Sequence, residues 1–85
     1  MEVEIYTKSS CPYCNSAKLL LNQKGASFKE YDVSDEKALA EMVHRSHGKM
    51  TVPQIFIGNE YIGGFDDLHA LDFSGQLDVK LGIRQ

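Results

Sequence analysis

The alternation of polar and apolar residues near the N-terminus predicts a strand followed by a helix. Residues 2–6 (Glu-Val-Glu-Ile-Tyr) alternate in the way typical of a strand that buries one face, and residues 7–10 form a polar loop. A helix is predicted from Pro12 to about Lys24, because proline suits the first helical turn and apolar residues recur at helical spacing. Gly25 is the stop signal of this helix. Its inward-facing residues are Cys14, Ala17, Leu20 and Leu21.

The next segment repeats this order of elements. Residues 27–32 (Ser-Phe-Lys-Glu-Tyr-Asp) alternate again and predict a second strand. Ser34 is expected to cap a second helix. This helix is expected to end near residues 47–48, and its apolar face consists of Leu39, Met42 and Val43.

The C-terminal part of the chain predicts a hairpin followed by helices. The apolar residues 54–57 and 60–62 flank Gly58-Asn59, a pair typical of a two-residue hairpin turn. A helix is predicted over residues 66–73 and a short one within residues 76–82, with a glycine separating them.

The resulting order β-α-β-α-β-β-α predicts an α/β fold in one domain, residues 1–85. The first β-α-β unit should be right-handed with parallel strands, whereas the hairpin should be antiparallel. A mixed four-stranded sheet with helices on both faces satisfies both conditions.

Composition narrows the function classes. Hydrophobic residues make up 42% of the chain, which suits a folded globule, and the net charge of −3 does not favour a nucleic-acid partner. No apolar run approaches ~18 residues, so no membrane span is predicted. Residues 1–10 lack the basic start and apolar region of a signal peptide. We therefore expect a cytoplasmic protein that starts at Met1.

The motif Cys11-Pro12-Tyr13-Cys14 contains both cysteines of the chain. An isolated Cys-x-x-Cys predicts redox or metal chemistry. Cys11 lies at the helix start, where unpaired N–H groups and the helix dipole favour the thiolate, which is the nucleophilic form. Cys14 lies one turn further on and faces inward. We assign Cys11 as the exposed attacking thiol and Cys14 as the buried resolving thiol.

The helix start alone does not account for a reactive thiolate at Cys11. Lowering a cysteine pKa by about three units requires roughly 4 kcal/mol, whereas a helix terminus supplies at most ~2 kcal/mol. Hydrogen bonds to the sulfur and a nearby cation must supply the rest. Lys8 is the best-placed cation in the sequence.

The cysteines also allow two other interpretations. They are either ordinary buried residues or, together with His44 and His47, a Cys₂His₂ zinc set. The segment between Cys14 and His44 is longer than in a zinc finger, and the second helix should pack away from the cysteine loop. Two surface histidines near a helix C-terminus are the simpler interpretation.

Three motifs in order resemble the dithiol glutaredoxin family. They are the Cys-Pro-Tyr-Cys motif after a strand, Thr-Val-Pro at residues 51–53 before an apolar strand, and Gly-Gly-Phe-Asp-Asp at residues 63–67. The resemblance covers the whole chain, which is similar to the bacterial glutaredoxin 3 type. It implies a thioredoxin-like fold with strand order 2-1-3-4, a cis peptide between Val52 and Pro53, and glutathione-dependent reduction of protein disulfides and glutathione mixed disulfides.

The resemblance also implies a glutathione site around Cys11, which bonds the glutathione sulfur. Lys8 and Tyr13 flank the tripeptide, and the Val52 backbone pairs with its cysteinyl residue. The other residues implied for this site are Thr51, Pro53, Gly64, Phe65, Asp66 and Asp67, of which the last four hold the γ-glutamyl end. These features fit the three charged groups of glutathione. A helix start can bind a carboxylate, acidic side chains can pair with the ammonium, and a lysine can balance the glycyl carboxylate.

Phe65 departs from the family pattern, in which a small or polar residue is common at this position. This departure bears on substrate preference rather than on reaction class. The expected partners are glutathione and disulfide-containing or glutathionylated proteins, with ribonucleotide reductase as a candidate client. Glutathione reductase is an indirect partner, and the protein is expected to be a monomer. Two alternatives stay open: an electron donor reduced by thioredoxin reductase, and an iron–sulfur or metal-binding scaffold. No resident metal is expected.

Overall fold

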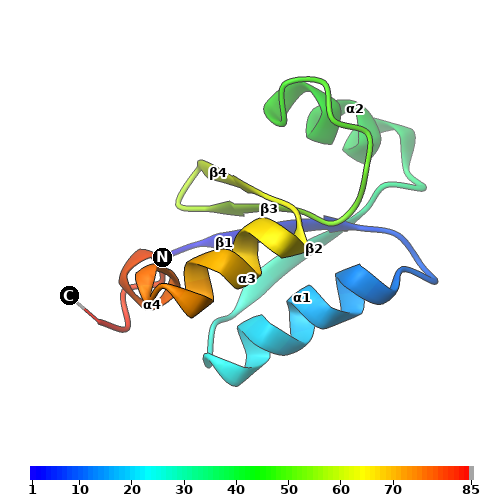
Figure 1. Ribbon diagram of the computed structural model, residues 1–85. Helices are drawn as coiled ribbons and strands as arrows, with labels where there is room; N and C mark the ends of the chain where they lie inside the picture. Colours follow the sequence, from blue (N-terminus) through cyan, green and yellow to red (C-terminus); the bar gives the residue numbers. More distant parts are fainter. Residues whose placement is uncertain (85) are drawn as a thin grey trace.

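The computed structural model describes residues 1–84 and contains a four-stranded sheet with four helices (Figure 1). The strand order is β2-β1-β3-β4, as the resemblance implied. The elements in chain order are β1 (Val3–Thr7), α1 (Pro12–Gln23), β2 (Phe28–Asp32), α2 (Glu36–Arg45), β3 (Gln54–Ile57), β4 (Glu60–Gly63), α3 (Phe65–Phe73) and α4 (Gln76–Lys80).

The sheet is mixed, as predicted. Strand β1 pairs with β2 in parallel and with β3 in antiparallel orientation, and β3 pairs with β4 in antiparallel orientation. Gly58 and Asn59 join β3 to β4 with φ of 56° and 70°. Two consecutive positive φ values are what a hairpin turn of type I′ requires, which confirms the predicted turn.

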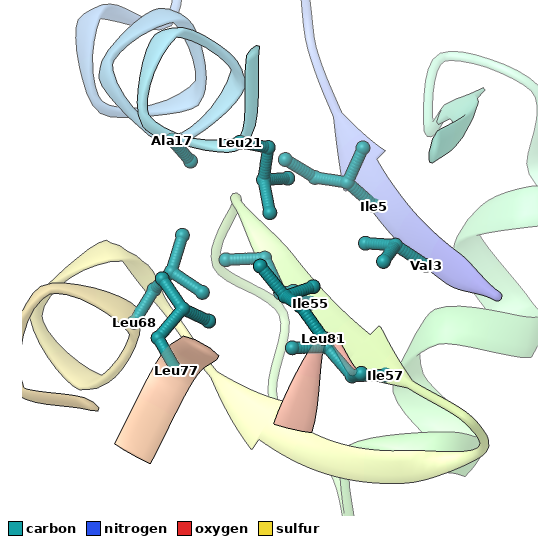
Figure 2. Close-up of a cluster of buried hydrophobic side chains, with 9 residues drawn as sticks. All are labelled: Val3, Ile5, Ala17, Leu21, Ile55, Ile57, Leu68, Leu77 and Leu81. Atoms are coloured by element: carbon teal, nitrogen blue, oxygen red, sulfur yellow. The ribbon is translucent and has the colours of Figure 1, made fainter. Parts of the chain in front are cut away.

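Helices α1 and α3 lie on one face of the sheet and α2 on the other (Figure 1). Figure 2 shows the larger cluster of buried apolar side chains, which joins α1, α3 and α4 to β1 and β3. Its members are Val3, Ile5, Ala17, Leu21, Ile55, Ile57, Leu68, Leu77 and Leu81. This core holds the start of α1 and the start of α3 on the same side of the sheet, and both helix starts contribute to the site described below.

The opposite face has a smaller core under α2. Tyr6, Val33, Met42 and Phe56 form it. The Tyr6 ring stacks on Tyr31 at 5.0 Å and meets Phe56 edge-on at 5.8 Å. Aromatic side chains thus supply most of the packing on this face.

The helix boundaries show which local signals were correct. Gly25 has φ of 71°, and the Ala26 N–H donates to the Leu21 carbonyl, so α1 ends in a Schellman motif at the predicted glycine. Helix α2 ends in the same way: His47 has φ of 60°, and the Gly48 N–H donates to Val43 at 2.8 Å.

The predicted cap of α2 was wrong by one residue. Asp35, not Ser34, is the N-cap, and its carboxylate accepts a hydrogen bond from the Ala38 N–H at 3.0 Å. The Ser34 N–H instead donates to the Asp32 carboxylate at 2.9 Å. This local turn at the end of β2 engages Ser34, which displaces the helix start by one position.

No helix within residues 1–84 combines the length and the apolar character needed to cross a membrane.

Candidate active site at the start of α1

Both cysteines lie at the start of α1, directly after the loop that follows β1. Cys11 is the N-cap and Pro12 takes the first helical position, as the sequence predicted. The Cys14 backbone N–H donates to Cys11 Sγ at 3.1 Å. The two sulfurs form a disulfide, in which Cys11 is half-buried and Cys14 is fully buried. The exposure of the two residues therefore agrees with an outer and an inner thiol.

The Val52–Pro53 segment faces the cysteines from the other side. Its peptide bond is cis, as expected. The Val52 carbonyl oxygen lies 3.9 Å from Cys11 Sγ. The structure thus brings together two motifs that are about forty residues apart in the sequence.

A buried glutamine holds this segment in place. Gln54 is 3% exposed, and its amide nitrogen donates to the carbonyl and hydroxyl oxygens of Thr51 at 3.0 and 3.1 Å. The Tyr61 hydroxyl donates to the Gln54 amide oxygen at 2.7 Å, and burial raises the pKa of that hydroxyl. Because every polar group of the Gln54 amide has a partner, the backbone around Val52 is fixed before any ligand arrives.

The start of α3 forms the third side of the site. Gly63 has φ of 119°, a conformation that favours glycine, and a Cβ atom there would collide with the Asp67 carboxylate. That carboxylate accepts a hydrogen bond from the Gly64 N–H at 3.0 Å. Asp67 is therefore a helix-capping residue, and the first N–H groups of α3 lack partners within the helix.

These three segments enclose an open groove of about 300 Å³. Charge is divided along it: Lys49 lies at the Thr51 side, whereas two carboxylates and the helix N-terminus lie at the other. The lining residues are Tyr13, Lys49, Thr51, Val52, Pro53, Gln54, Tyr61, Gly64, Phe65, Asp66 and Asp67. Every residue expected at the glutathione site lines this groove except Lys8 and Cys11, and the Cys11 Sγ lies 3.9 Å from the carbonyl oxygen of the lining residue Val52.

Lys8 lies in a second hollow, on the other side of the cysteine loop, together with Asn15, Lys18 and Glu30. There the Glu30 carboxylate accepts hydrogen bonds from Thr7 at 2.7 Å and from Lys18 at 2.9 Å, and the Thr7 bond is the larger cause of its lowered pKa. The exposed Lys8 side chain is thus close to the cysteine loop but outside the groove.

Comparisons with known proteins agree with this geometry. The glutaredoxin family model matches residues 3–62. The chain is 54% identical to glutaredoxin 3 of Escherichia coli K12 over 79 residues, which cover 93% of this chain and 95% of that protein. The chain belongs to the glutaredoxin family.

Two solved structures extend this result to the fold. The solution structure of glutaredoxin from Brucella melitensis matches with a TM-score of 0.83 and 50% identity, over 98% of this chain and 90% of that one. The crystal structure of a buckwheat glutaredoxin–glutathione complex matches with a TM-score of 0.83 and 30% identity, over 94% of this chain and 76% of that one. The thioredoxin-like fold is confirmed.

Glutaredoxins are glutathione-dependent thiol–disulfide oxidoreductases, and this glutaredoxin is an enzyme of that class. Cys11 and Cys14 form a disulfide, consistent with a dithiol active site.

The alternative metal set of cysteines and histidines does not assemble in the structure. Across residues 1–84, no group of three or more histidine, cysteine or acidic side chains is placed to hold a metal ion. The His47 ring instead packs edge-on against Tyr61 at 6.0 Å, and His44 is exposed on α2.

Sequence reasoning missed three residues of the groove in this glutaredoxin: Lys49, Gln54 and Tyr61. Lys49 carried a usable signal, since it lies two residues before Thr-Val-Pro and is a cation beside a segment expected to bind a peptide with two carboxylates. Gln54 and Tyr61 carried none, because each reads as an ordinary strand residue and their link spans the hairpin.

Proposed function

We propose that glutathione lies in the groove with its sulfur at Cys11 and that this glutaredoxin reduces glutathione mixed disulfides and protein disulfides. The observation that carries the proposal is the position of Cys11 Sγ. It accepts a backbone N–H at the positive end of α1 and lies 3.9 Å from the Val52 carbonyl at the edge of the groove.

Cys11 is the nucleophile. After reduction, the N–H group of Cys14 and the helix dipole are both positioned to stabilise negative charge on Cys11 Sγ. The thiolate attacks the glutathione sulfur of a mixed disulfide, which forms the Cys11–glutathione disulfide and releases the substrate thiolate. A second glutathione thiolate then attacks the glutathione sulfur, which releases oxidised glutathione and regenerates the Cys11 thiolate.

Cys14 is the resolving thiol for protein disulfides. Its side chain is fully buried, so it does not meet a substrate first. Once Cys11 is joined to a substrate cysteine, the Cys14 thiolate attacks Cys11 Sγ and releases the substrate as a dithiol. Two glutathione molecules reduce the resulting Cys11–Cys14 disulfide and are themselves oxidised to one disulfide.

The groove offers a partner to each polar part of glutathione. The Val52 backbone pairs with the cysteinyl residue, between Thr51 and the Pro53 turn, while Tyr13 covers the outer side. At the start of α3, the free N–H groups at Phe65 and Asp66 bind the γ-glutamyl carboxylate. The γ-glutamyl ammonium pairs with the side chains of Asp66 and Asp67, since Asp67 uses only one carboxylate oxygen for capping Gly64.

Lys49 and Lys8 each take one of the two roles that the sequence assigned to Lys8 alone, the partner of the glycyl carboxylate and the cation near Cys11. Lys49 lines the groove and balances the glycyl carboxylate. Lys8 stands on the other side of the cysteine loop and contributes positive potential to the Cys11 thiolate. The similarity to the buckwheat glutaredoxin–glutathione complex supports glutathione as the ligand.

The physiological setting follows from this chemistry. A dithiol that must be reduced by glutathione works in a reducing compartment, so we place the enzyme in the cytoplasm as a monomer whose oxidised glutathione is recycled by glutathione reductase. Its clients are glutathionylated or disulfide-bonded proteins, and ribonucleotide reductase is one candidate.

The direct test couples the enzyme to glutathione reductase and follows NADPH consumption with a glutathionylated peptide. Turnover that depends on both enzyme and glutathione is expected. If NADPH were consumed with thioredoxin reductase in the absence of glutathione, and not in the coupled system, the alternative electron donor would replace this proposal.

Lys49→Gln is expected to raise the KM for glutathione about fivefold with little change in kcat. The lost interaction is an exposed charge pair of about 1 kcal/mol. Lys8→Gln is expected instead to slow alkylation of Cys11 by iodoacetamide at pH 6, because fewer molecules carry the thiolate.

Lys37→Gln, which neutralises an exposed lysine on α2, is the matched control and should leave both measurements unchanged. A rise in KM for Lys8→Gln but not for Lys49→Gln would reverse the assignment of the two lysines.

A further inference from the structure

Three rings form a row on the surface beside the active site. The residue Tyr13 is 63% exposed, and the centre of its ring lies 6.1 Å from that of Phe65. The centre of the Phe65 ring lies 5.7 Å from that of the His69 ring. Tyr13 comes from the start of α1, and the other two rings from the first two turns of α3. We refer to Tyr13, Phe65 and His69 as the aromatic row.

The aromatic row joins two hollows of the surface. Phe65 lines the groove assigned above to glutathione, and it also lines a third hollow, between α1 and α3. This third hollow is lined by Leu19, Leu20 and His69, with the polar residues Ser16, Gln23 and Asp72 beside them. A ligand in the groove that extends away from Cys11 along the helices therefore meets further apolar side chains.

Core packing accounts for only part of this surface, because Phe65 and Leu20 pack against the larger core with one side and remain partly exposed. Leu68, on the inner side of α3, is fully buried in the core, whereas Phe65 is only half-buried and His69 is exposed. Leu19 on α1 is 59% exposed. A contiguous apolar surface at the rim of an active site is typical of a binding surface.

We propose that the aromatic row binds the polypeptide part of glutathionylated substrates and selects those with an aromatic or large aliphatic side chain near the modified cysteine. This inference rests on the function proposed above. When Cys11 attacks, the new bond joins Cys11 to the glutathione sulfur, and the bond between that sulfur and the substrate cysteine breaks. The substrate thiolate leaves with its electron pair and takes a proton from water.

The position of glutathione decides which surface the polypeptide meets. Glutathione fills the groove from Val52 to the start of α3, and Tyr13 and Phe65 both line that groove, so their rings are within reach of a polypeptide attached to the glutathione sulfur. The two ring separations of 6.1 and 5.7 Å correspond to about three to four residues of extended chain. The selected side chain therefore lies within about four residues of the cysteine.

The test uses four substrates in the coupled assay with glutathione reductase. Three are glutathionylated peptides of glycine and serine with one cysteine: one has phenylalanine three residues before the cysteine, one has it three residues after, and one has serine at both positions. The fourth is the mixed disulfide of glutathione and 2-mercaptoethanol, which has no polypeptide. We expect kcat/KM to be about fivefold higher with phenylalanine than with serine on one side of the cysteine.

His69→Ser tests the row without altering the glutathione groove. It is expected to reduce the preference for phenylalanine to about twofold or less and to leave the rate with the small disulfide unchanged. His44→Ser, the same substitution at an exposed histidine on α2, is the matched control and should keep the preference. Thermal melting of both variants verifies that they are folded.

The outcomes separate this inference from the function it rests on. Loss of the preference in His69→Ser alone supports the row. Equal rates for all peptides with the wild-type enzyme, or an unchanged preference in folded His69→Ser, would overturn it while leaving the proposed function intact. Failure of the wild-type enzyme to turn over even the small disulfide would reject the proposed function itself.

Discussion

Cys11→Ser is expected to reduce turnover of glutathione mixed disulfides by at least about 1000-fold, whereas Cys14→Ser retains most of it. A serine hydroxyl is not ionised near neutral pH and is a poor nucleophile without a neighbouring base. Cys14 is not needed for this reaction, because a glutathione thiolate can resolve the Cys11–glutathione disulfide. The measurement is the initial rate of NADPH consumption in the coupled assay at saturating glutathione.

A second substrate separates the roles of the two thiols. On a protein with an internal disulfide, Cys14→Ser should lose most of its activity, since the mixed disulfide with Cys11 is no longer resolved from within. The Cys14 backbone N–H, which donates to Cys11 Sγ, is retained in the variant. If both variants lost activity equally on the mixed disulfide, while melting like the wild type, the assignment of nucleophile and resolving thiol would be wrong.

The parts of the site that the sequence predicted are those determined by local chemistry. Pro12 at the first helical position places Cys11 at the positive end of α1, and this requires no tertiary contact. Gly58 and Asn59 set the hairpin by their own conformational preferences. Strand order and the cis bond before Pro53 came from the family resemblance instead, because neither follows from periodicity.

The parts that the sequence did not predict depend on contacts between distant elements. The Thr51–Gln54–Tyr61 chain of hydrogen bonds closes only when β3 and β4 pair. Lys8 and Lys49 both flank site motifs in the sequence, and only the folded chain shows that Lys49 lines the groove while Lys8 faces the second hollow. Charge near a motif thus predicted the kind of partner but not which lysine supplies it.

A polar network under α2 was equally invisible in the sequence. Arg45 donates to the Glu4 carboxylate and to the Tyr6 hydroxyl, each at 2.9 Å, and its guanidinium carbon lies 3.9 Å from the centre of the Phe56 ring. The Tyr6 hydroxyl in turn donates to Glu41 at 2.6 Å, and burial raises the pKa of Tyr6 to about 12. One residue of α2 therefore ties this helix to the sheet face that carries the smaller core.

Arg45→Met is expected to destabilise the enzyme by about 2–3 kcal/mol at pH 7. The Glu4 and Arg45 side chains are only 15% and 21% exposed, so the substitution leaves a largely desolvated carboxylate without its cation. Methionine retains part of the packing against Phe56, so the loss is mainly electrostatic. Urea unfolding followed by far-UV circular dichroism gives the difference in the free energy of unfolding.

The pH dependence of the difference in unfolding free energy tests whether loss of the Glu4–Arg45 ion pair causes the destabilisation. The hydrogen bond from Arg45 is the main reason that the pKa of Glu4 lies below its ordinary value of 4.5. A carboxyl group with a lowered pKa in the folded state stabilises the protein above its unfolded pKa, and this contribution is lost as the pH falls through the folded pKa. The gap in unfolding free energy between wild type and Arg45→Met should therefore be constant from pH 7 to about 5 and shrink towards pH 3.

Lys29→Met is the control for loss of a surface cation. Lys29 pairs with Glu2 at 3.4 Å, but both side chains are more than 60% exposed, so we expect no measurable change in the free energy of unfolding at any pH. Acidic groups outside the network around Arg45 are not affected by the substitution, so their contributions cancel in the difference between the two proteins. If the difference in unfolding free energy between wild type and Arg45→Met stayed the same at pH 3, the destabilisation would be due to lost packing over Phe56 and not to loss of the Glu4 ion pair.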